Sequence, residues 1–201
     1  MLNARCLNDD GSCGEGRALS ELRIMTTLDD HGRVDPPDSA DEAATLLGFL
    51  DYQRATFGWK TSGLNAAELS VTIAASNMTL GGMMKHLALD EDSWLSERLM
   101  GKESSPPWAH VDWGSDPDWE WHSAANDSPE MLRTLWEESV GRSQASVAEF
   151  LLDGDLGQLA RRQDGRAPSA RWILCHMIEE YARHNGHADL LREAIDGETG
   201  E

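Results

Sequence analysis

The chain has 201 residues, enough for one domain of moderate size with a buried core. It carries 17 Lys and Arg residues against 36 Asp and Glu, a net charge of −19. Because binding to phosphate groups needs a basic face, this charge argues against nucleic acids and anionic membrane surfaces as partners. The sequence shows neither a secretory signal nor a run approaching the roughly 18 apolar residues of a membrane span. We therefore expect a cytoplasmic protein.

Residues 1–38 are predicted to be a poorly ordered N-terminal extension, because they are rich in Gly, Asp, Ser and Arg. A helical domain is predicted over 39–197. Its first helix is expected to begin near Ser39, whose spacing from Glu42 matches a capping box. Apolar residues then recur at helical spacing, namely Leu46, Leu47, Leu50, Phe57 and Leu64.

The second helix is predicted to run from Thr79 to about Gly101, with one face formed by Met83, His86, Leu87, Asp90 and Trp94. The connection over 101–128 contains three prolines that break helices, and it carries Trp108, Trp113, Trp119 and Trp121. These tryptophans could form a lid over a substrate site, or they could pin a long crossover to the bundle. We favour the pinning role.

The third helix is predicted from Ser128 to about Leu152, and the fourth from about Ser169 to about Ile195. No segment of any length has the alternation of a strand. The sequence therefore predicts an all-α protein, a four-helix bundle with a long Trp-rich crossover between helices two and three.

The fourth helix carries an unusual set of polar residues within its apolar stripe. At about 100° per residue, His176, Glu180, His184 and His187 fall within an arc of about 80°. Burying these groups without partners is costly, so they must form a polar network or bind a cation. Glu180 and His184 are four residues apart, which lets both side chains converge on one ion.

His86 is the best candidate for a third ligand, because it lies in the middle of the apolar face of the second helix. Two nitrogens, one carboxylate oxygen and an open position form the pattern of a catalytic zinc site. Nickel, iron and cobalt accept the same donors. Asp90 or His187 could hold an imidazole N–H or join the ligands. The weaker candidates are His31, His110 and His122.

Two other polar residues, Cys175 and Arg54, are expected to have structural roles. Cys175 precedes His176 but points about 100° away from it, and we expect a small packing residue. Arg54 on the first helix is expected to form an ion pair at the surface.

Three segments, over 50–56, 79–88 and 176–189, resemble the DinB/YfiT-like superfamily of metal-binding four-helix bundles. The likeness covers about 35–197. In that superfamily one histidine on the second helix and two residues four apart on the last helix hold a divalent metal. The matching residues here are His86, Glu180 and His184. Many members have histidine at both last-helix positions, whereas this chain has Glu180 at the first of them. The resulting His, Glu, His set resembles that of the branch containing mycothiol-dependent maleylpyruvate isomerase and related thiol S-transferases. The closer likeness is to single-domain, largely uncharacterised actinobacterial members.

The resemblance implies a metal-dependent enzyme that activates a low-molecular-weight thiol of the mycothiol type and transfers it to an electrophilic small molecule. Zinc is the first expectation for the metal, and a homodimer is a further expectation. One alternative is a non-catalytic bundle that binds a metal or small ligand in a stress response. Another is a structural bundle whose histidines form a polar core network. Beyond the metal ligands, the sequence assigns no catalytic residue.

Overall fold

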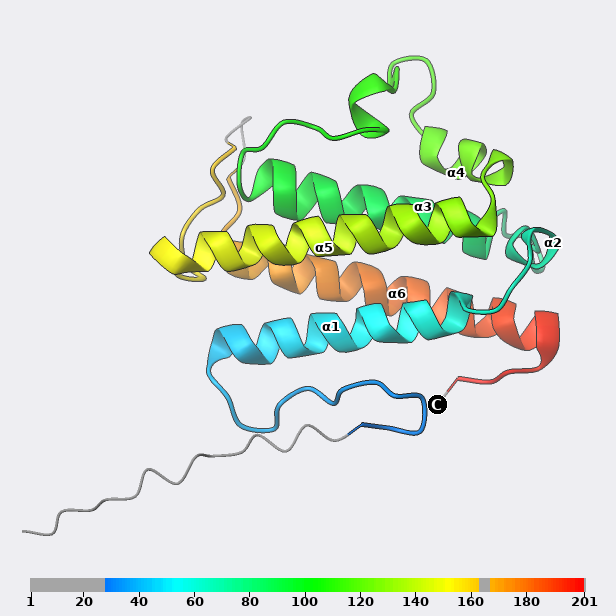
Figure 1. Cartoon of the computed structure of the whole chain (residues 1–201), viewed down its shortest axis with the longest axis horizontal. Helices are drawn as coiled ribbons and strands as arrows, with labels where there is room; N and C mark the ends of the chain where they lie inside the picture. The colour runs from blue at the N-terminus through cyan, green and yellow to red at the C-terminus, as the bar shows by residue number, and fades with distance from the viewer. Residues whose placement is uncertain (1–27, 163–166, 201) are drawn as a thin grey trace, which may run out of the picture.

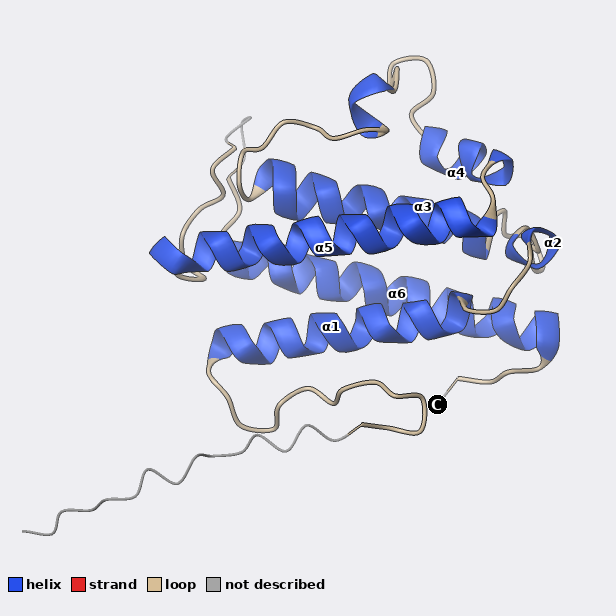
Figure 2. Ribbon diagram, viewed as in Figure 1, coloured by secondary structure: helices blue, strands red, loops and turns tan. Residues whose placement is uncertain are grey.

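The computed structural model describes residues 28–162 and 167–200. Its framework consists of long helices lying side by side, with α1 (Glu42–Thr61) against α6 (Ala170–Asp196) and α3 (Leu80–Asp90) against α5 (Pro129–Asp153) (Figure 1). Within the described residues there is no strand, only two isolated bridges joining Leu28 to Val34 and Leu159 to Ser169 (Figure 2). The predicted all-α bundle is confirmed.

Each long helix begins at a side chain that accepts a hydrogen bond from a free backbone N–H of the first turn. The predicted helix starts at Thr79, Ser128 and Ser169 are confirmed, and each of these residues is an N-cap. The predicted start at Ser39 is wrong. The N-cap of α1 is Asp41, whose carboxylate accepts from the N–H of Ala44 and so takes the role assigned to the serine hydroxyl.

The second long helix changes its winding along its length. α3 continues directly into the π-helix η1 (Glu91–Arg98), and Gly101 follows with φ of 70°. Gly197 after α6 has φ of 82°. Both glycines adopt the left-handed conformation that commonly ends a helix. The hydrophobic period predicted the length of this helix and did not reveal the wider turn at Glu91.

The Trp-rich crossover contains short helices that the sequence did not predict: η2 (Trp108–His110), α4 (Trp119–Ser123) and η3 (Ala124–Asn126). The short helix α2 (Ala66–Leu69) between α1 and α3 was not predicted either, although Asn65 and Glu68 form a capping box there. The crossover rises away from the bundle and returns so that α4 packs on α3 (Figure 1). Trp108 is buried, and the other crossover tryptophans are half-buried.

The core lies between the long helices. It includes side chains with no exposed surface from α1, α3 and α6, among them Leu50, Phe57, Met83, Ile173 and Met177. Removing such apolar surface from water stabilises the fold by about 25 cal/mol per Å². This packing fixes the relative positions of α3 and α6, which carry the predicted metal ligands.

Residues 28–38 are an exception to the poor order predicted for 1–38. The guanidinium of Arg33 is buried, pairs with Asp29 at 2.6 Å and donates to Oγ1 of Thr56 on α1 at 2.8 Å. His31 stacks on Trp59 with ring centroids 3.6 Å apart. This segment therefore lies along α1, while residues 1–27 of the predicted extension lie outside the described residues.

None of the helices among the described residues combines the length and apolar character needed to cross a membrane.

Candidate metal centre

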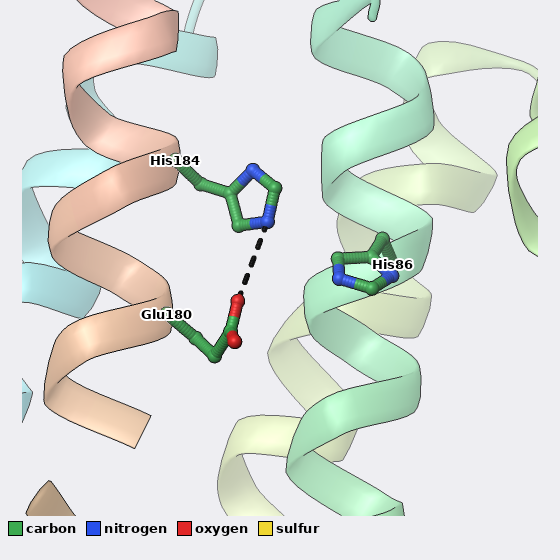
Figure 3. A group of neighbouring side chains, drawn as sticks. All are labelled: His86, Glu180 and His184. Atoms are coloured by element: carbon green, nitrogen blue, oxygen red, sulfur yellow. Dashed lines mark ion pairs between the residues drawn. The ribbon is translucent and has the colours of Figure 1, made fainter. Parts of the chain in front are cut away.

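The predicted ligands come together between α3 and α6. His86 lies on α3, Glu180 and His184 lie on α6, and one donor atom from each is within 4.8 Å of the other two (Figure 3). Nε2 of His184 is 3.7 Å from Oε2 of Glu180. Donors of a tetrahedral zinc site lie about 3.4 Å apart at ordinary zinc–ligand distances. A small side-chain adjustment would therefore bring all three donors onto one ion.

His184 is in the state that a metal ligand needs. Its side chain is buried, and burial together with the nearby His86, His187 and Arg183 lowers its pKa to about 4. The imidazole is therefore neutral at physiological pH and has a lone pair available. Its buried Nδ1 has no hydrogen-bond partner among the described residues.

His86 is held from several sides. Its Nδ1 lies 3.2 Å from Oε1 of Glu120, and its Nε2 lies 3.3 Å from Oδ2 of Asp90, the residue expected beside it. Trp121 stacks on the imidazole with centroids 4.8 Å apart. Burial alone would lower the pKa of His86, but the hydrogen bond to Glu120 and the surrounding carboxylates, including Glu180, raise it. Without a cation nearby, His86 therefore tends to take up a proton.

Negative charge accumulates around the two imidazoles. Asp90, Glu120 and Glu180 have no Lys or Arg partner in the part of the chain that is described. Burial raises the pKa of Asp90 to about 7, and Glu180 and Glu120 add to the rise while His86 opposes it. Three clustered carboxylates without a basic partner, beside two imidazoles, favour a bound cation, so this set of residues fits a divalent metal.

The remaining histidines are arranged differently. His187 is exposed, with its ring 5.9 Å from that of His184, and it is not part of the ligand group. The ring of His176 contacts the rings of both Trp94 and Trp172. Its Nε2 lies 4.0 Å from Oε1 of Glu180, and it forms a second group with Glu179 and Glu180. The weaker candidates His31, His110 and His122 lie outside both groups.

Glu120 is a residue of the site that the sequence analysis missed. It belongs to a connection with no helical period, so no periodicity placed it near the bundle core. Its position between Trp119 and Trp121 was the one available signal, because two aromatic residues tend to anchor the segment between them.

Two plain interpretations were wrong. Cys175 is exposed and is not a packing residue. Arg54 does form an ion pair, but the pair is buried. Its Nη2 lies 2.6 Å from Oε2 of Glu91, whose side chain has no exposed surface. The sequence placed Arg54 correctly on the first helix, but no local pattern could show that an acid on η1 faces it.

Two pockets adjoin the residues around His86. One has a volume of about 430 Å³ and is lined by Trp121 together with Thr79 and Gly82 at the start of α3. The other, of about 320 Å³, includes Asp90 and Trp108 in its walls. Both have room for small molecules, and His86, Glu180 and His184 line neither of them.

The fold and the ligand group define an all-α bundle with a His, Glu and His site between its second and last long helices. A family model described as mycothiol S-transferase matches residues 45–197. The chain therefore belongs to the mycothiol S-transferase family, as its resemblance to the mycothiol-related branch implied. No curated protein matches the chain.

Proposed function

We propose that this protein is a divalent-metal-dependent thiol S-transferase in which His86, Glu180 and His184 hold the metal. The observation that carries the proposal is the convergence of these three side chains from α3 and α6, with donor atoms within 4.8 Å of one another. Membership of the mycothiol S-transferase family supports mycothiol as the thiol and an electrophilic small molecule as its acceptor.

The proposed reaction needs a thiolate, because the thiolate is the nucleophile. A divalent metal with an open position supplies the positive charge that lowers the pKa of a thiol bound to it. In a transfer, the sulfur forms a bond to a carbon of the electrophile, the leaving group departs with the electron pair of the broken bond, and the thiol proton passes to solvent. The two histidines contribute neutral nitrogens and Glu180 one negative charge, which leaves the site cationic enough for an anionic sulfur.

Zinc is the first metal to test, and nickel, iron and cobalt follow because they accept the same donors. We also propose a cytoplasmic location, where low-molecular-weight thiols are kept reduced. A host that makes mycothiol, as actinobacteria do, would supply the co-substrate. The homodimer stays a prediction.

Elemental analysis of protein purified without a histidine tag tests the metal site. Wild type is expected to carry about one divalent metal per chain. H86A and H184A are expected to lose it, while H122A should keep it because His122 is exposed and pairs with Asp116. Unchanged metal content in H86A and H184A would show that the ligand assignment is wrong.

Thiol consumption tests the reaction. The loaded protein is incubated with mycothiol and a reactive probe such as monobromobimane, and free thiol is followed over time. We expect catalysed loss of thiol in wild type and none above background after chelation or in H184A. A protein that binds metal without consuming thiol with any electrophile would instead favour the non-catalytic metal-binding bundle.

A further inference from the structure

The short helix α4 of the Trp-rich crossover contacts the metal-ligand group through two consecutive residues. Glu120 accepts at Oε1 from Nδ1 of His86, and Trp121 stacks on the same ring. Glu120 is 5% exposed, although it belongs to a connection between helices. A carboxylate so deeply buried in the crossover has to be stabilised by what it contacts.

The contact with Glu120 determines which nitrogen of His86 is free. An ionised carboxylate can only accept a hydrogen bond, so beside ionised Glu120 the hydrogen of His86 lies on Nδ1. In a neutral imidazole, Nε2 then has the lone pair and can bind a metal. The Nδ1–Oε1 contact has hydrogen-bond geometry, whereas the 3.3 Å contact between Nε2 and Asp90 is an ion-pair contact without it.

A second observation concerns the other oxygen of Glu120. Oε2 is buried and has no hydrogen-bond partner among the described residues. No Lys or Arg in this part of the chain pairs with Glu120, and its carboxylate contacts the imidazole of His86 instead. Carboxylates that hold a ligating histidine in this way fix its orientation and raise its basicity.

We propose that Glu120 is a positioning residue of the metal site, which fixes the tautomer and orientation of His86 and couples the site to the crossover. This inference rests on the proposed metal-binding function. It gives the crossover a role beyond pinning, because α4 holds one ligand in place while α3 and α6 carry the ligands themselves.

The test measures Co²⁺ affinity by competition with a chelator and records the Co²⁺ absorption spectrum of each variant. E120A is expected to weaken binding by about 10- to 100-fold and to change the spectrum, as loss of such partners commonly does. E120Q keeps an acceptor oxygen and should recover most of the affinity. The melting temperature of each metal-free protein separates a loss of fold from a loss of ligand position, and E120Q provides the folded comparison if E120A does not fold.

D116A is the matched control. Asp116 also holds a histidine of the crossover, with Oδ1 2.9 Å from Nδ1 of His122, but that pair is away from the ligand group. The Co²⁺ affinity of D116A should equal that of wild type. E120A with wild-type affinity and spectrum would overturn the inference, as would a loss confined to D90A, which would show that Asp90 positions His86. Failure of wild type to bind any metal would overturn the proposed function and this inference with it.

Discussion

Glu91 is a fully buried carboxylate whose stability contribution can be tested one residue at a time. Both of its oxygens accept from Arg54, at 2.7 and 2.6 Å, and Oε1 also accepts from the hydroxyl of Tyr181 at 2.8 Å. Removing one partner of a buried ion pair leaves the other charge uncompensated, which typically destabilises a protein by about 3–5 kcal/mol.

We therefore expect E91Q to lower the free energy of unfolding in urea by an amount in that range. E42Q is the control, because Glu42 pairs with Arg171 in an exposed ion pair that should contribute little. Equal losses in the two variants would contradict a structural role for the buried pair.

Asp92, the next residue, should make the free energy of unfolding depend on pH in the acidic range. Burial works to raise its pKa, but Arg142 and the hydrogen bonds from Trp108 and Ser139 outweigh burial and lower it. A carboxylate with a lowered pKa in the folded state stabilises the fold fully above its unfolded pKa of about 3.9. That stability is lost as pH falls through the folded pKa.

We expect the free energy of unfolding of wild type to fall steeply below about pH 3.9, where the unfolded state takes up the proton first. D92N should be less stable at neutral pH and should lack this part of the acid dependence. Urea titrations at a series of pH values measure both effects. Parallel curves for the two proteins would contradict the assignment.

At the scale of elements, the packing of α4 on α3 depends on a glycine. A Cβ added to Gly82 would lie 2.7 Å from Cε3 of Trp121 and 3.0 Å from Oγ1 of Thr79, so the ring would have to move. G82A is expected to lower the free energy of unfolding by about 1–3 kcal/mol, as overpacking commonly does, and to weaken Co²⁺ binding. Urea unfolding measures the first effect, and competition with a chelator measures the Co²⁺ affinity.

Gly141 on α5 offers the matched control for the Gly82 variant. A Cβ added there would meet nothing within 4 Å. Alanine is the better helix former by about 0.5–1 kcal/mol, so G141A should stabilise the protein and leave Co²⁺ binding unchanged. If G82A is also stabilising, Trp121 does not need the space that Gly82 leaves.

At the scale of the whole molecule, periodicity and capping predicted the long helices well. Thr79, Ser128 and Ser169 are short polar residues directly before apolar stripes, and each proved to be an N-cap. The start of α1 was predicted two residues early because Ser39 and Asp41 are both suitable caps. The short helices of the crossover escaped prediction because a single turn has no period to detect.

The convergence of the three predicted ligands could be inferred from the sequence because all three lie on regular helices. His86, Glu180 and His184 interrupt apolar stripes, and a helical wheel is enough to aim them at the core. Glu120 and the Arg54–Glu91 pair depend on how segments far apart in sequence meet. Such contacts follow from tertiary packing, so no local sequence pattern predicts them.

The most direct test of the central claim is X-ray absorption spectroscopy on the zinc-loaded protein. We expect two imidazole nitrogens and one carboxylate oxygen at about 2.0–2.2 Å, with a light atom from solvent completing the shell. One imidazole should be lost in H86A and one in H184A. A shell without imidazole, or one that both variants leave unchanged, would contradict a metal site between α3 and α6.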